Sequence, residues 1–104
     1  MHNLVGDKIK ALLKDAGKSI AELGVRTDTH AGYWSQVING TKRLSVDLAI
    51  KLGKVFPIER VTEESQIIEP SAYWLSLQYQ SDVKNAVSLD GPMYRNIKPF
   101  GGNE

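Results

Sequence analysis

The sequence predicts an all-α fold of about five helices followed by an extended C-terminal tail. Apolar residues recur every three or four positions through most of the chain, which is the spacing of one helix face. Residues typical of helix ends, such as Gly17, Ser19 and Ser45, separate these stretches. The pair Asn39-Gly40 often turns a β-hairpin, but here both flanks have helical spacing. We therefore interpret Asn39-Gly40 as the end of one helix.

The first two predicted helices are short and separated by a clear stop signal. The first covers residues 3–16 and ends before Gly17. The second starts at Ile20, because Ser19 and Glu22 have the spacing of a capping box, in which each side chain binds the other residue's backbone amide. The second helix is expected to bury three side chains: Ile20, Leu23 and either Val25 or Thr27.

The third and fourth predicted helices flank the Asn39-Gly40 pair. Trp34, Val37 and Ile38 share one helix face, and the adjacency of the last two argues against an alternating strand. Ser45 is a natural N-cap for the fourth helix, which Pro57 ends. The apolar residues of the fourth helix recur at helical spacing: Leu48, Ala49, Leu52, Val55 and Phe56.

The second half of the chain is less regular. Residues 57–69 form an acidic connecting segment that is either a loop or an extra short helix, and the spacing does not decide between them. A fifth helix is predicted over residues 70–87, and residues 88–104 are predicted to form a flexible tail. The apolar side of this helix is expected to contain Trp74, Leu75, Leu77, Tyr79 and Val83. The tail offers four side chains for docking: Met93, Tyr94, Ile97 and Phe100.

Composition and charge restrict the possible functions. The chain has 104 residues, enough for one domain, and a net charge of +1 that divides into +4 for residues 1–56 and −3 for residues 57–104. The sequence lacks cysteine, which fits a cytoplasmic protein, and it lacks an apolar run long enough for a membrane span. It contains no catalytic or phosphate-binding motif, so we expect no enzyme activity and no cofactor. Two histidines without a spaced acidic partner predict no metal site.

Helices two and three form a helix-turn-helix motif, with about three residues between them and the small Gly24 where they cross. With the helices placed in this way, residues 6–56 resemble the lambda-repressor-like (XRE-type) DNA-binding family. The segments that carry the resemblance are "SIAELG" and "WSQVINGTKR". The string "LSVDLAIKLGKVF" followed by "PSAYWLSLQ" is similar to HigA-type antitoxins. This resemblance implies a transcriptional repressor that binds double-stranded DNA at an inverted-repeat operator, as a homodimer, and that neutralises a toxin protein.

The resemblance assigns DNA binding to the exposed side of the third helix and to the residues around it. Gln36 is the best base reader, because its amide pairs with an adenine edge, while Thr41, Lys42 and Arg43 are placed to bind phosphate. The full expected set is Lys18, Ser19, His30, Ala31, Gly32, Tyr33, Ser35, Gln36, Thr41, Lys42 and Arg43. The dimer or partner surface is expected at Tyr73, Trp74 and Leu77.

Several positions depart from the family pattern. Ile20 replaces a usual glutamine, and Ala31 and Gly32 occupy usual base-reading positions. Thr27 and Thr29 stand where the pattern prefers Leu and Val. Direct base contacts should therefore be few, with DNA shape contributing to specificity. Two alternatives remain: a phage or plasmid repressor without a toxin, and a protein-interaction module that has lost DNA binding.

Overall fold

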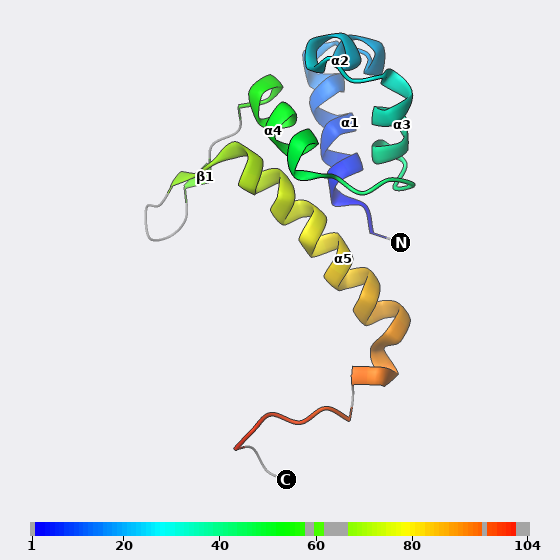
Figure 1. Ribbon diagram of the computed structural model, residues 1–104, viewed down its shortest axis with the longest axis vertical. Helices are drawn as coiled ribbons and strands as arrows, with labels where there is room; N and C mark the ends of the chain where they lie inside the picture. Colours follow the sequence, from blue (N-terminus) through cyan, green and yellow to red (C-terminus); the bar gives the residue numbers. More distant parts are fainter. Residues whose placement is uncertain (1, 58–59, 62–66, 95, 102–104) are drawn as a thin grey trace.

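The computed structural model describes residues 2–57, 60–61, 67–94 and 96–101 (Figure 1). The predicted all-α architecture with about five helices is confirmed. The helices are α1 (Leu4–Ala16), α2 (Ile20–Thr27), α3 (Ala31–Ile38), α4 (Val46–Val55) and α5 (Pro70–Tyr94). The first four helices form a bundle, and α5 runs under it and projects beyond it (Figure 1).

The described part of the connecting segment is extended. Two short antiparallel strands, β1 (Arg60–Val61) and β2 (Ile67–Ile68), pair through Arg60 with Ile68 and Val61 with Ile67. Both strands consist largely of β-branched residues, which favour extended backbone. Residues 58–59 and 62–66 of this segment lie outside the described residues.

The predicted caps are present at the helix ends. Ser19 Oγ accepts a hydrogen bond from the Glu22 amide at 3.2 Å, and Ser45 Oγ accepts one from the Leu48 amide at 3.2 Å. The capping box is only half formed, because the carboxylate of Glu22 accepts from Ser19 Oγ (3.4 Å) and not from the Ser19 amide. Gly40, with φ +86°, follows the end of α3 at Asn39, so the pair does end a helix.

The core lies where the helices meet, and it includes both tryptophans. The buried apolar residues are Val5, Ile9, Leu13, Leu23, Trp34, Val37, Ile38, Leu44, Leu48, Ala49, Leu52, Tyr73 and Trp74. In α2 the second inward residue is Thr27, which is buried, whereas Val25 is 83% exposed. Tyr73 and Trp74 pack edge to face, with ring centroids 6.0 Å apart. The predicted partner surface is therefore wrong at these two residues, since they fill the core of their own chain.

Helix α5 is longer than predicted and changes its apolar face along its length. It continues to Tyr94, seven residues past the predicted end, through Gly91 and Pro92. Its first turns bury Trp74 and half-bury Leu75 and Leu77 against the core. Two predicted members of the same apolar side, Tyr79 and Val83, are instead 70% and 43% exposed, so that part of the prediction is wrong. Past the helix, Ile97 and Phe100 are exposed and do not dock on the described part of the chain.

Polar residues on the inner face of α5 hold the start of the chain. The Ser81 hydroxyl, in a buried side chain, accepts from the Leu4 amide at 2.9 Å. Asn85 makes two hydrogen bonds with the backbone of His2, one as acceptor (2.7 Å) and one as donor (3.0 Å). The N-terminus is thereby fixed to a helix about eighty residues later. Of the helices that the structure describes, none combines the length and the apolar character that crossing a membrane requires.

Candidate nucleic-acid interface

The crossing of α2 and α3 depends on Gly24. A Cβ atom at this position would lie 2.7 Å from the Thr29 carbonyl oxygen, closer than Cβ atoms approach such an atom, and 3.2 Å from the Ala31 amide nitrogen, which is tighter than most such contacts. Asp28, at φ +49°, and two further residues make the turn between the helices. The prediction that a small residue lets α3 approach α2 is therefore confirmed at Gly24.

The two threonines that depart from the family pattern stabilise this turn through hydrogen bonds. Thr27 Oγ1 accepts from the Trp34 indole nitrogen at 2.8 Å and donates to the Leu23 carbonyl at 2.7 Å. Thr29 Oγ1 donates to the Thr27 carbonyl at 3.1 Å and accepts from Lys51 Nζ at 2.9 Å. A leucine at position 27 would leave the buried indole N–H without its acceptor, so Thr27 and Trp34 form a matched pair.

Helix α3 has one buried and one exposed face. Trp34 and Val37 face the core, with 0% and 1% exposure. The other face is open to solvent and carries most of the predicted base-reading residues. The exposed members are His30, Gly32, Tyr33 and Gln36, and the half-buried members are Ala31 and Ser35.

His30 is the N-cap of α3, so part of its hydrogen-bonding capacity serves the fold. Its Nδ1 atom accepts from the Gly32 amide at 3.0 Å. An accepting Nδ1 in a neutral imidazole leaves the proton on Nε2, which can donate outward. The backbone carbonyl of His30 accepts from the Tyr33 amide at 3.0 Å. His30 therefore sets the start of α3 and presents one donor at its edge.

The turn after α3 is exposed and internally ordered. Asn39 Oδ1 accepts from both the amide (3.0 Å) and the hydroxyl (2.6 Å) of Thr41. Lys42 Nζ lies 5.2 Å from the centre of the Tyr33 ring, within the range of a cation–π interaction. The turn therefore packs its lysine against the exposed face of α3, which brings the predicted phosphate-binding and base-reading residues together.

Arg43 is held by α5 through an ion pair that the sequence analysis did not predict. Its Nη2 atom lies 2.7 Å from Asp82 Oδ2, and Asp82 Oδ1 accepts from Gln78 Nε2 at 3.0 Å. Gln78 Oε1 in turn accepts from the Leu44 amide at 2.9 Å. Gln78 ends the string "WLSLQ", which was the only sequence signal for this contact. Asp82 is about forty residues from Arg43 and gave no signal.

Lys18 and Ser19 lie at the start of α2. Lys18 Nζ pairs with the Glu22 carboxylate at 3.5 Å, and the Lys18 side chain borders a pocket that α1, α2 and α4 surround. Both residues of this pair are half-exposed, so solvent weakens the attraction. Lys18 is exposed, but its ammonium already pairs with Glu22.

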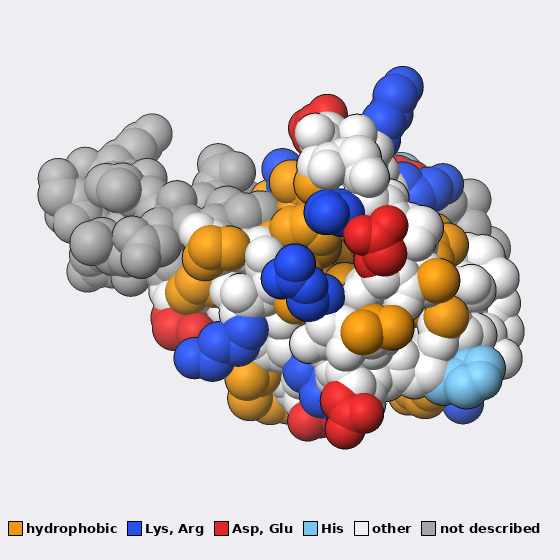
Figure 2. All heavy atoms as spheres, turned by 90° about the horizontal axis from the view of Figure 1, so that it is seen from above, with side chains coloured by type: hydrophobic (Ala, Val, Ile, Leu, Met, Phe, Trp, Pro, Cys, Tyr) orange, Lys and Arg blue, Asp and Glu red, His pale blue; other side chains and the backbone are white. Residues whose placement is uncertain are grey.

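The charged side chains do not form one uniform basic surface. Seen from the α2 end, lysine and arginine side chains alternate with acidic ones, and apolar side chains appear between them (Figure 2). Three described cations lie near the third helix: Lys42 and Arg43, which are exposed, and Lys51, whose ammonium contacts Thr29 and pairs with Asp47 at 3.3 Å. Within the part of the chain that the structure describes, no three metal-ligating side chains lie close enough to hold an ion.

The fold and these contacts define the class of protein: a helix-turn-helix domain of the lambda-repressor-like type with an added long helix, α5. No protein-family model matches the sequence, and no curated protein matches it. Solved structures with the same fold include antitoxins of the HigA family.

Three of these structures cover almost the whole chain. An addiction-module antidote protein of the HigA family from Coxiella burnetii is 20% identical, with a TM-score of 0.76 over 96% of this chain and 100% of that one. The antitoxin HigA of Pseudomonas aeruginosa, with the higBA promoter, is 20% identical, with a TM-score of 0.75 over 92% and 95%. The P. aeruginosa protein PA4674, in complex with its 18-bp operator DNA, is 20% identical, with a TM-score of 0.77 over 93% and 95%. These shares of the chain are too large to leave out α5, so the likeness to the three structures extends over the whole fold.

Proposed function

We propose that this protein is a DNA-binding transcriptional repressor of the HigA-like antitoxin kind, which binds its own operator and neutralises a toxin. The observation that carries the proposal is the exposed face of α3, continuous with the exposed cationic turn of Lys42 and Arg43. Proteins of the same fold that have been solved with promoter or operator DNA support it.

In this proposal α3 lies in the major groove, which is wide enough for a helix. Gln36 pairs with an adenine edge, and Tyr33, one turn earlier on the same face, contacts base or phosphate. Ser35 adds a hydroxyl, and the methyl of Ala31 contacts a thymine methyl. Gly32 adds no side chain, so specificity also depends on DNA shape.

The residues around α3 bind the DNA backbone. Thr41, Lys42 and Arg43 contact phosphate on one side of the groove, and the first amides of α2 contact it on the other, beside Lys18 and Ser19. To reach phosphate, the Lys42 side chain must either move off the Tyr33 ring or move together with it. Arg43 must exchange the Asp82 carboxylate for phosphate. Because the phosphate contacts of Lys42 and Arg43 both replace existing interactions, each adds less to the free energy of DNA binding.

The homodimer interface is proposed on the outer face of α5, in place of Tyr73 and Trp74. Tyr79, Val83 and Val87 are spaced four residues apart and form one helical stripe. Their exposed fractions are 70%, 43% and 58%, and no described element covers them. A second copy of α5 can cover this stripe symmetrically, as in most two-fold dimers. Such a dimer would place two α3 helices on an inverted repeat about one DNA turn, or roughly 34–36 Å, apart.

A toxin protein is the third partner in this proposal, and the fold shared with antitoxins supports it. Since a repressor acts at the chromosome, we place the protein in the cytoplasm. We assign it no enzyme activity, because its proposed work is binding. A phage or plasmid repressor without a toxin is the alternative, and co-purification with the product of a neighbouring gene distinguishes the two.

The first test is a gel shift with the protein's own upstream region. Wild type should shift one fragment selectively. Gln36→Ala should lose selectivity by about 1–3 kcal/mol at the base it reads. The double variant Lys42→Ala/Arg43→Ala should weaken binding to every fragment and flatten the salt dependence. Absence of any shift at low salt would support the interaction-module alternative.

The second test concerns the dimer. Val83→Glu places a charge in the proposed stripe and should convert the dimer into a monomer in analytical ultracentrifugation. Lys84→Glu is the matched control, because it changes a neighbouring exposed residue of α5 outside the stripe. A dimer that survives Val83→Glu would place the interface elsewhere.

A further inference from the structure

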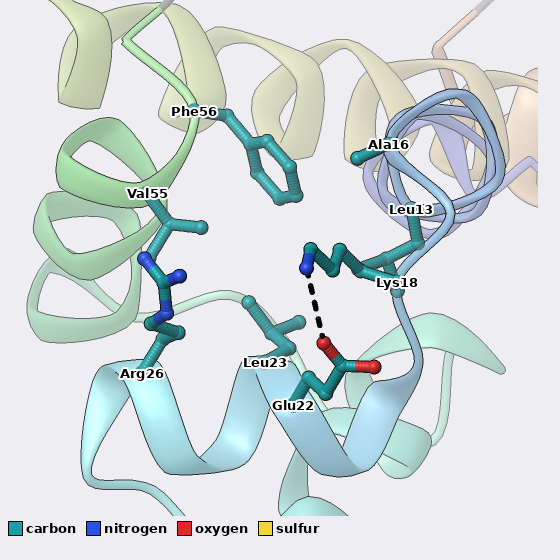
Figure 3. A pocket seen from close by; sticks show the side chains of 8 residues that line it. All are labelled: Leu13, Ala16, Lys18, Glu22, Leu23, Arg26, Val55 and Phe56. Carbon is teal, nitrogen blue, oxygen red and sulfur yellow. Dashed lines mark ion pairs between the residues drawn. The ribbon is translucent and has the colours of Figure 1, made fainter.

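The pocket that Lys18 borders lies away from the exposed face of α3, between the C-terminal ends of α1 and α4 and one face of α2 (Figure 3). Its volume is about 220 Å³. An apolar cavity of about 150 Å³ is known to bind benzene. The hollow therefore has room for one substituted aromatic ring, but not for a long peptide segment.

The inner surface of this pocket is apolar. Leu13 and Leu23 form its floor and are 6% and 2% exposed. Val55 and Phe56 form the wall on the α4 side and are half-buried. The Phe56 ring packs on the fully buried Trp74, with centroids 6.3 Å apart at an angle of 43°. A ligand ring in the pocket would bury the remaining exposed surface of Phe56 without displacing a core residue.

Three charged side chains surround the opening. The ammonium of Lys18 points into the hollow, where it pairs with Glu22, and Arg26 stands beside Val55 on the other side (Figure 3). Arg26 makes no ion pair with any residue that the structure describes. The rim thus has two cations against one carboxylate, and an unpaired guanidinium suits a carboxylate ligand because its donors match the two oxygens.

We propose that this pocket binds a small aromatic carboxylate, with the ring against Leu23 and Phe56 and the carboxylate between Arg26 and Lys18. An apolar hollow with a few polar groups at its edge is the usual design of a small-molecule site. The anion competes with Glu22 for Lys18, and that pair is long at 3.5 Å and half-exposed, so it yields readily.

One consequence rests on the proposed function. Lys18 and Ser19 are proposed to contact phosphate at the start of α2, and a carboxylate held by Lys18 removes that cation from the interface. A bound ligand should therefore weaken operator binding. Ligand binding does not require DNA, so it is tested on the free protein. Its outcome is therefore separate from that of the proposed repressor function.

The test is calorimetric titration of the full chain with 3-phenylpropanoate and, as the uncharged probe, 3-phenylpropanamide. Wild type should bind the carboxylate saturably at one site per chain and the amide about tenfold more weakly, the effect of one charge-assisted hydrogen bond. Arg26→Gln should weaken the carboxylate by about the same factor and leave the amide unchanged.

A filling variant checks the location of the site. Ala16 is exposed at the rim, so Ala16→Phe should occupy the hollow and abolish binding, whereas Ala11→Phe, on the exposed side of α1, should not. Circular dichroism and thermal melting confirm that each variant is folded. Lack of saturable binding to wild type, equal binding of the two probes, or binding that survives Ala16→Phe would each overturn the proposal.

Discussion

The Arg43–Asp82 ion pair offers the most informative perturbation of the proposed repressor. It joins the cationic turn after α3 to α5 at a distance of 2.7 Å. Asp82→Asn removes the negative charge but keeps the shape of the side chain, so the hydrogen bond from Gln78 can persist. The Leu44 amide, which donates to Gln78, then keeps its partner. The variant therefore changes the electrostatics of the turn and not its backbone.

The expected gain follows from the exposure of the pair. The Arg43 side chain is 71% exposed and that of Asp82 is 34% exposed, so their attraction is screened and worth about 0.2–1 kcal/mol. In Asp82→Asn, Arg43 does not lose this attraction when it moves to phosphate. The variant also removes a negative charge close to the DNA. We expect Asp82→Asn to tighten operator binding by roughly two- to fivefold. The slope of log K against log salt should steepen by up to about 0.9, the value for one added phosphate contact.

The measurement is fluorescence anisotropy of a labelled operator at several salt concentrations. Asp7→Asn is the control, because it changes the net charge equally but breaks only an exposed α1 pair with Lys10. Long-range electrostatics alone would give the same gain in both variants. An unchanged or weakened affinity in Asp82→Asn, with normal stability, would refute the idea that Asp82 restrains Arg43.

Three further predictions concern the fold. Gly24→Ala should destabilise the protein by up to about 2 kcal/mol, because about 1–3 kcal/mol of overpacking against Thr29 exceeds a helix-propensity gain of about 1 kcal/mol; urea unfolding measures this. Thr27→Val should cost about 1–3 kcal/mol, because it leaves the buried Trp34 N–H without an acceptor. Hydrogen bonds from the Ser71 hydroxyl, and then from the Ala72 and Ser71 amides, lower the pKa of Glu69 from its usual value. The carboxylate therefore stabilises the start of α5 above the unfolded-state pKa, and this stabilisation is lost as pH falls through the lower folded-state pKa. The melting-temperature difference between wild type and Glu69→Gln should thus be present at neutral pH and disappear in acid.

Each of these has its control. Gly32→Ala adds a methyl that would meet only the His30 ring, so it should not destabilise the protein as Gly24→Ala does. Thr41→Val removes an exposed hydroxyl and should cost little beside Thr27→Val. A pH-independent difference for Glu69→Gln would show that the carboxylate charge is irrelevant to α5.

Local signals in the sequence were enough for the first four helices. N-caps such as Ser19 and Ser45 bind a backbone amide only three residues away. Gly24 and Gly40 affect the backbone at their own positions. Both effects can be derived without knowing the fold. The exposed face of α3 also follows from its own spacing, because the positions of Trp34 and Val37 determine which side is left for Gln36.

The contacts of α5 could not be derived in this way. Its apolar residues follow two different faces: Tyr73 and Trp74 point inward in the first turns, and Tyr79 and Val83 point outward in the next. A single stripe drawn through them joins residues that lie on opposite sides of the helix. The inward face continues with polar residues such as Ser81, whose partners are about eighty positions away and become visible only once the chain is folded.

Because its apolar residues change from the inner to the outer side, α5 has two proposed roles in the same two helical turns. Gln78 and Asp82 hold the turn with Arg43, while Tyr79 and Val83, the next residue after each of them, face outward to the proposed second copy. In the proposed dimer, packing of the two copies would act on the same two turns of helix that position Arg43. Any partner that shifts α5 to cover the outer stripe must also move the carboxylate of Asp82 relative to the turn. In this arrangement, assembly and DNA affinity are coupled through one helix, and no separate signal between the two surfaces is required.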